Sequence, residues 1–121
     1  MNKYKKRILI DLDGVLNDYG TEPFDENHIP KIKEGAREFV EVLSKTAELY
    51  LFTTRNAKLS AKWLTENNLD EYFKDITNIK IPAFLHIDDR CVCFNGNYKD
   101  TLTEINNFSV YWKNKKKKGI K

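Results

Sequence analysis

Short apolar runs alternate along the chain with stretches of helical periodicity, and this alternation predicts an α/β fold. The runs have the length of buried strands, and polar residues follow them. Between the runs, apolar residues recur every three or four positions among charged ones, as on the buried face of a helix. The expected strands are Arg7–Leu12, Glu48–Thr53, Asp75–Ile79 and Phe84–Ile87, with a further candidate at Cys91–Phe94. One expected helix starts at Lys31, and two others cover Asn56–Asn67 and Thr101–Phe108.

The order of these elements indicates how the strands pair. Strands that alternate with helices form right-handed crossovers, which build a parallel, three-layer, Rossmann-like sheet. Ligands of such sheets bind at the carboxyl ends of the strands. The polar residues that follow the predicted strands are Asp11, Asp13, Thr53, Thr54, Asp88 and Asp89. We therefore expect a functional site where these side chains converge.

Length and composition fit one globular domain. The chain has 121 residues, of which 40% are hydrophobic and 32% charged. No apolar run approaches the roughly 20 residues of a membrane span. Only three apolar residues separate the basic N-terminus from Asp11, so we expect no secretory signal, no membrane contact and a cytoplasmic location. A single domain is expected over 1–112, and a basic, disordered tail over 113–121.

The charge is unevenly distributed. Residues 3–7 carry four basic side chains and residues 113–121 carry six, which leaves 11 basic and 18 acidic side chains between them. The body of the protein therefore has a net charge of −7. Such a body is a poor general surface for nucleic acid, because phosphate neutralisation supplies most of that affinity. It suits a protein that gathers carboxylates around a divalent cation.

Asp11 and Asp13 form the most informative local pattern. Residues i and i+2 at the end of a strand project to the same side, so the two carboxylates are held close together. Their repulsion favours binding of a hard cation such as Mg²⁺. One carboxylate could attack phosphorus, and its neighbour could donate and accept a proton. The alternative is a solvated loop, which Gly14 and the apolar strand before it make less attractive.

Four motifs carry a resemblance to the haloacid dehalogenase superfamily of phosphohydrolases. The sequence DLDGVL at 11–16 resembles the first motif, and LYLFT at 49–53 resembles the second. Lys80, within NIKIPA, matches the third, and Asp88 and Asp89, within LHIDDR, match the fourth. The motifs stand in the order that the family has and span residues 8–90. One departure is Ile81, which separates the lysine from the proline that often follows it directly in small relatives.

The resemblance implies a role for each matching residue. Asp11 would be the nucleophile, Asp13 the general acid and base, and Lys80 the group that neutralises the phosphoryl charge. Substrate binding is implied for Thr53 and Thr54. The implied Mg²⁺ ligands are Asp11, Asp13 and Asp88. Asp89 would reach the metal's waters or bind backbone, because adjacent strand residues point to opposite faces. Lys74 is a weaker rival to Lys80.

The resemblance also predicts an open site, because the chain leaves no room for a cap domain after the first or second motif. Open relatives tend to act on large or polymeric phosphoesters, including nucleic-acid 3′ ends, or on small ones when oligomerised. The implied partner is a phosphoester substrate. The alternatives are a 3′-phosphatase of nucleic-acid repair and a non-enzymatic module of the same fold whose basic tail docks to nucleic acid; nucleic acid is not the favoured partner.

Other residues near the motifs have structural interpretations. Arg55 and Arg90 are expected to form ion pairs. His86 is expected to be a hydrogen-bonded core histidine, and His28 an exposed loop residue. Cys91 and Cys93 are expected to be small buried side chains, since two cysteines offer too few ligands for a zinc site. The aromatic residues Trp63, Tyr72, Phe73 and Trp112 are interpreted as packing.

Overall fold

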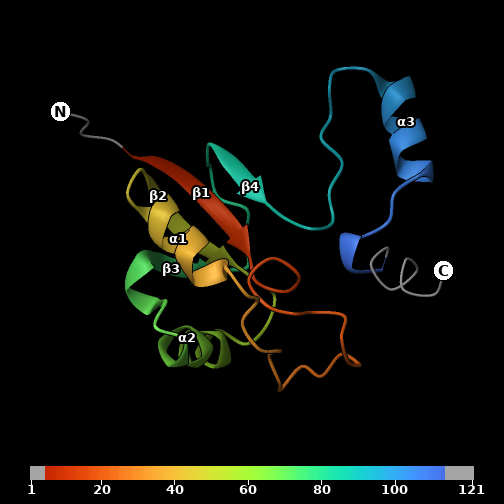
Figure 1. Cartoon of the computed structure of the whole chain (residues 1–121). Coiled ribbons are helices and arrows are strands. Elements are labelled where there is room, and N and C mark those ends of the chain that lie inside the picture. Colours follow the sequence, from red (N-terminus) through yellow and green to blue (C-terminus); the bar gives the residue numbers. More distant parts are fainter. Residues whose placement is uncertain (1–4, 114–121) are drawn as a thin grey trace.

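The sheet organises the molecule. The structure is a computed structural model, and it describes residues 5–113. Four parallel strands lie in the order β3-β2-β1-β4 (Figure 1). Their bounds are Lys6–Asp11 for β1, Ala47–Phe52 for β2, Phe73–Thr77 for β3 and Leu85–Ile87 for β4. The expected parallel α/β fold without a cap is confirmed, and three of its strand ends carry the predicted polar residues.

Within residues 5–113, three complete α-helices and one short 3-10 helix connect or follow the strands, and residues 111–113 are also helical. The complete helices are α1, Ala36–Ser44; α2, Ala57–Glu66; η1, Asp70–Tyr72; and α3, Tyr98–Asn106. The side chain of Asn56 accepts the backbone N–H of Leu59, and that of Asn97 accepts the N–H of Asp100. Such caps satisfy backbone donors that have no partner within the helix. They fix the starts of α2 and α3.

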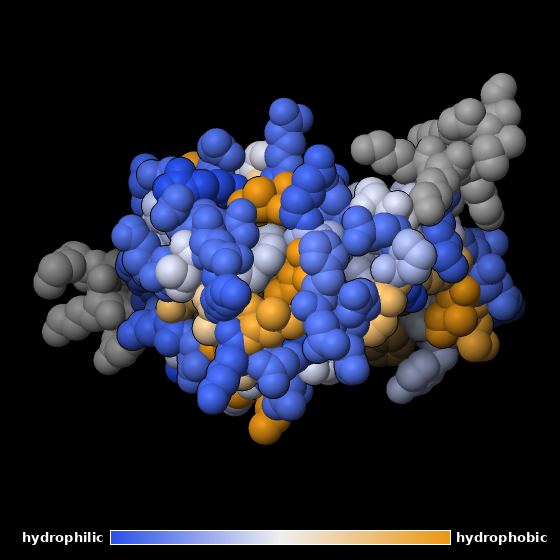
Figure 2. All heavy atoms as spheres, turned by 90° about the horizontal axis from the view of Figure 1, so that it is seen from below, coloured by the Kyte–Doolittle hydropathy of each residue, from blue (hydrophilic) through white to orange (hydrophobic). Residues whose placement is uncertain are grey.

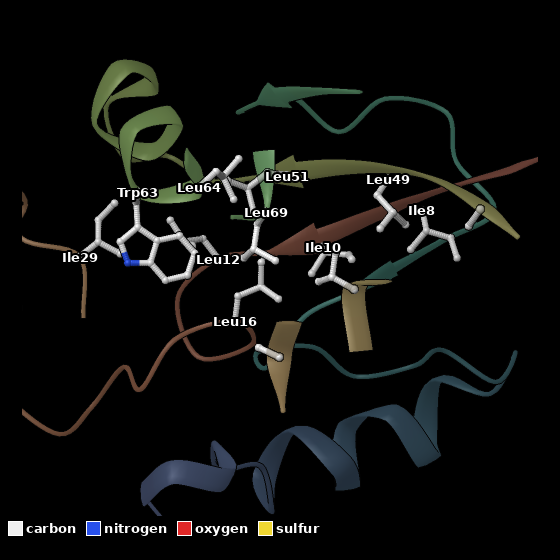
Figure 3. Packing of buried hydrophobic residues seen from close by; sticks show 13 residues of the cluster. Ile8, Ile10, Leu12, Leu16, Ile29, Leu49, Leu51, Trp63, Leu64 and Leu69 are labelled. Atoms are coloured by element: carbon white, nitrogen blue, oxygen red, sulfur yellow. The ribbon is translucent and has the colours of Figure 1, made fainter. Parts of the chain in front are cut away.

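The core lies on one face of the sheet. Alternate residues of β1 and β2 point into it, and side chains of α1 and α2 pack against them (Figure 3). The largest fully buried side chains of this cluster include Ile10, Leu12, Leu16, Leu49 and Leu51. Full burial of one such side chain is worth about 1.5–3 kcal/mol. Both packed helices therefore cover the same face of the sheet.

The remaining elements are less enclosed. In Figure 1, α3 stands apart from the sheet, and its Tyr98, Leu102 and Ile105 are exposed. The connection from β3 to β4 contains no helix; Arg7 donates to the Pro82 carbonyl, and its own carbonyl accepts the Phe84 N–H. Figure 2 shows a mostly hydrophilic lower face with separate apolar patches. The part of the chain that the structure describes has no helix with the length and apolarity of a membrane span.

Several expected boundaries are wrong. The first helix begins at Ala36 instead of Lys31, because residues 31–33 pair with the loop after β1 and Gly35 adopts a φ of +90°. Helix α3 begins at Tyr98, at the Asn97 cap, instead of Thr101. Residues 91–94 form no strand, and Cys91 and Cys93 are exposed instead of buried. The expected disordered tail lies outside the described residues except for Lys113.

Candidate functional site

Three aspartates meet where β1 and β4 end. Asp11 is the last residue of β1, and Asp88 and Asp89 directly follow β4. The two strands are neighbours, with Ile10 opposite Ile87, so these residues emerge side by side. Each of the three offers a carboxylate oxygen, and these oxygens lie within 4.8 Å of one another. The structure thus brings Asp89 into the group, although we expected only one of the adjacent pair to point there.

The electrostatics of the cluster are unfavourable for three free carboxylates. Burial, followed by the charges of Asp88, Asp89 and Asp13, raises the pKa of Asp11 from 3.8 to about 8. Burial also raises the pKa of Asp89, partly offset by a hydrogen bond from Trp112. A divalent cation would relieve this repulsion, and oxygen ligands suit Mg²⁺. The donor set therefore fits the metal that the sequence implied, with Asp11, Asp88 and Asp89 as the residues that would hold it.

Asp13 lies outside this group, contrary to its expected role as a metal ligand. Its Oδ2 accepts a hydrogen bond of 2.8 Å from Arg55 Nε, and its Oδ1 accepts one of 3.0 Å from Asn17 Nδ2. The buried Asn17 also accepts the backbone N–H of Gly14 through its Oδ1. Asp13 is thus turned toward protein donors that hold it in one orientation. The sequence offered no sign of the part that Asn17 plays.

Arg55 links the second strand to the loop after β1. Its side chain is only 3% exposed and forms the expected ion pair, with Asp13. Its Nη1 donates to the backbone carbonyls of Asp25 and His28, and its guanidinium lies 4.9 Å from the ring centre of Phe24. A planar guanidinium can serve several acceptors at once, which lysine cannot do. Arg55 therefore fixes both the loop over the site and the Asp13 carboxylate.

Thr53 follows β2 and is buried at the same rim. Its N–H donates to the Thr77 carbonyl, and its Oγ1 accepts the N–H of Arg55 at 3.1 Å. These bonds leave the hydroxyl hydrogen of Thr53 to donate to an acceptor. Thr54 is exposed and makes no hydrogen bond within the described chain. The structure thus supports the placement of Thr53 more firmly than that of Thr54.

The two candidate lysines lie at different ends of the sheet. Lys74 is near the amino ends of the strands, with its Nζ 3.8 Å from the Glu48 carboxylate. This position removes it from the rim that carries Asp11. Lys80 is exposed, three residues beyond the carboxyl end of β3, and makes no hydrogen bond or ion pair with another residue of 5–113. The structure does not bring Lys80 into contact with the aspartates.

The chain's last described residues reach the site, which the sequence interpretation missed. Tyr111 donates from its hydroxyl to the carbonyl of Gly14 at 2.6 Å, and Trp112 donates from Nε1 to Asp89 Oδ2 at 2.8 Å. A Cβ on Gly14, whose φ is +86°, would collide with the Asp89 carboxylate. Burial and the charge of Asp89 raise the pKa of Tyr111. Sequence spacing gave no signal for these contacts, because 97 positions separate Tyr111 from Gly14 and 23 separate Trp112 from Asp89.

Three other residues near the site differ in part from expectation. His86 packs edge-on against Phe52, with ring centres 4.8 Å apart, but its buried Nε2 has no hydrogen-bond partner among the described residues. Arg90 forms no ion pair within 5–113 and lies 5.4 Å from the Trp112 ring centre. His28 is exposed as expected, with Nε2 3.5 Å from Glu22. None of them belongs to the acidic cluster.

Comparison with known proteins supports the fold alone. No protein-family model matches the chain, and no curated protein matches it. The structure is similar to a solved one described as the conserved protein coded by a locus of Bacteroides thetaiotaomicron. The two share 20% sequence identity and superpose with a TM-score of 0.58, over 89% of this chain and 95% of the other. At this identity the likeness shows a shared fold.

Proposed function

We propose that the protein is a Mg²⁺-dependent phosphohydrolase of the haloacid dehalogenase type that works through an aspartyl-phosphate intermediate. The observation that carries the proposal is the convergence of Asp11, Asp88 and Asp89 at the carboxyl edge of a parallel sheet, with Thr53 directly after the adjacent strand. Three mutually repelling carboxylates cost free energy unless a cation binds among them, and that cation would then also attract an anionic substrate. A site for phosphoryl transfer uses that arrangement.

The proposed reaction has two steps on this chain's residues. A carboxylate oxygen of Asp11 attacks phosphorus; the new O–P bond forms as the bond to the leaving oxygen breaks, and Asp13 gives that oxygen a proton. Water then attacks the phosphorus as the bond between phosphorus and the Asp11 oxygen breaks; Asp13 takes a proton from the water, inorganic phosphate leaves, and the carboxylate of Asp11 is restored. Arg55 and Asn17 hold Asp13, and each carboxylate oxygen keeps a second lone pair for the proton in transfer.

The other residues act on charge and orientation. Thr53 donates its hydroxyl to a phosphoryl oxygen, and Lys80 approaches from the loop after β3 to neutralise charge there. Mg²⁺, when bound by Asp11, Asp88 and Asp89, supplies positive charge that allows Asp11 to stay ionised beside an anionic substrate. Arg55 fixes the loop after β1, and no cap domain of residues 5–113 covers the rim, so the site admits a phosphoester from solvent.

Hydrolysis of an aryl phosphate tests the proposal. We expect turnover with Mg²⁺ and none in excess chelator. Asp11→Asn removes the nucleophile and should abolish turnover, and Asp13→Asn should lower it about 10²–10⁴-fold, the usual worth of general acid–base catalysis. The matched control is Asp75→Asn, an exposed aspartate on β3. Full activity in chelator would refute the metal requirement.

The choice of substrate separates this proposal from its rivals. A panel of sugar phosphates, nucleotides and 3′-phosphorylated oligonucleotides identifies the substrate class. Hydrolysis confined to oligonucleotides would favour a 3′-phosphatase of nucleic-acid repair. A folded protein that binds nucleic acid and hydrolyses no phosphoester would favour the non-enzymatic module. In the described chain the basic residues Lys5, Lys6 and Arg7 lie at the amino end of β1, at the opposite end from the acidic rim. Because they are remote from the reacting phosphate, they support a small phosphoester substrate over a polynucleotide.

A further inference from the structure

We infer that Trp112 is a positioning residue that orients Asp89 for metal binding. The indole Nε1–H donates to Oδ2 of Asp89 at 2.8 Å, and Asp89 is a member of the acidic cluster. A hydrogen bond from a neighbouring donor fixes the rotamer of a ligating carboxylate and so tunes metal affinity. The inference rests on the proposed metal site, and it assigns part of that site to a residue remote in sequence.

The indole is itself held on several sides. Its ring lies so close to Gly20 that a Cβ there would come within 2.5 Å of it. Tyr19 packs edge-on against it, with ring centres 5.3 Å apart and planes at 76°. The guanidinium of Arg90, from the residue that follows Asp89, lies 5.4 Å from the ring centre. These contacts leave the indole little rotational freedom, so its N–H points at Asp89 before any cation arrives.

The backbone around Trp112 is anchored as well. Val110 is buried, and the hydroxyl of Tyr111 donates to the carbonyl of Gly14. Gly14 in turn lies directly against the Asp89 carboxylate, where any larger residue would collide with it. The carboxylate of Asp89 is therefore confined between the loop after β1 and the segment 110–112. Gly14 limits the movement of the carboxylate by close contact, and Trp112 donates a hydrogen bond to it.

Trp63 shows what a purely structural tryptophan looks like in the same molecule. Its Nε1–H donates to the carbonyl of Pro30, and its ring belongs to the hydrophobic core. That acceptor is a neutral carbonyl and is not part of the acidic cluster. The acceptor of Trp112 is a carboxylate of the cluster, and a hydrogen bond to an ionised group is stronger than one between neutral groups. The two tryptophans therefore offer a built-in comparison between packing and positioning.

Nuclear magnetic resonance of the full chain tests the inference without an activity assay. The protein has two tryptophans, so its ¹H–¹⁵N spectrum has two indole N–H signals, which Trp112→Phe assigns. On titration with MgCl₂ we expect the Trp112 signal to shift with saturation and the Trp63 signal to stay in place. Binding that leaves the Trp112 signal unmoved would overturn the inference while leaving the metal site intact.

Calorimetric titration with Mg²⁺, and with Mn²⁺ as a tighter-binding probe, measures how much Trp112 contributes to metal affinity. Trp112→Phe keeps an aromatic ring but removes the N–H donor, and we expect the dissociation constant to rise about tenfold to hundredfold. Trp63→Phe is the control, and should lower thermal stability with unchanged metal affinity. Equal affinities of wild type and Trp112→Phe would refute positioning. If the wild type binds neither cation, the proposed metal site fails, and the inference fails with it.

Discussion

Arg55→Met removes the group that joins Asp13 to the loop over the site. Methionine preserves much of the buried apolar stem but none of the N–H donors. The Asp13 carboxylate, whose side chain is 23% exposed, loses an ion pair of 2.8 Å, and the Asp25 and His28 carbonyls lose their donor. Removing one partner of a fully buried pair costs about 3–5 kcal/mol, and since water reaches Asp13 and these loop carbonyls we expect about 2–3 kcal/mol.

Urea unfolding, followed by circular dichroism, measures this loss. The matched control is Arg37→Met, an exposed arginine of α1 whose side chain makes no hydrogen bond or ion pair in the described chain; this change should alter stability by about 0.5 kcal/mol or less. In the double variant Arg55→Met/Asp13→Asn the unpaired carboxylate is gone, so the combined loss should fall short of the sum by about 1 kcal/mol or more. A loss below about 1 kcal/mol for Arg55→Met, or strict additivity, would refute the reasoning.

Three further predictions test the site and its surroundings. Lys80→Ala should lower kcat/KM by an amount that corresponds to a loss of about 2–4 kcal/mol of transition-state stabilisation. Lys74→Ala should leave kcat/KM unchanged. The reverse result would assign the third motif to Lys74. Because the pKa of Asp11 is about 8 in the folded protein and 3.8 ordinarily, the folded state retains a proton that the unfolded state has released. The free energy of unfolding of the metal-free protein should therefore fall as pH rises from about 4 to about 8, and Mg²⁺ should make this fall smaller. Thermal melts across that pH range measure the effect. A melting temperature that rises with pH would contradict the prediction. Deletion of 113–121 should leave kcat and KM unchanged for a small substrate at moderate salt, where charges are screened beyond about 10 Å, while a raised, salt-sensitive KM on oligonucleotides would indicate a polynucleotide substrate.

The sequence predicted the elements whose signals are local. The apolar runs of β1 and β2, the Asn56 cap of α2 and the acids after β1 and β4 all lie within a few positions of what they determine. The start of α1 was misplaced because residues 31–33 satisfy the helical period yet pair with the loop after β1. Here a tertiary hydrogen-bond pattern overrides periodicity.

The site was predictable in part for the same reason. Parallel strand order alone places Asp11, Thr53 and Asp88 on one rim. The side-chain directions were not predictable, because Asp13 turns toward Arg55, a residue 42 positions away, and Asp89 joins the cluster under constraints from Gly14 and Trp112. Periodicity carries no information about such contacts, which depend on the path of the loops.

The contact between Tyr111 and Gly14 joins residues 97 positions apart, and this has a consequence for biosynthesis. The ribosome delivers β1 and its acidic loop first, and the indole that completes their surroundings much later. An N-terminal fragment that ends within α3 can contain all four strands, yet its Asp89 lacks the partner that holds it. Closing so long a loop costs chain entropy that only the finished sheet repays. The order of synthesis therefore places all four strands before the residue that completes the surroundings of Asp89.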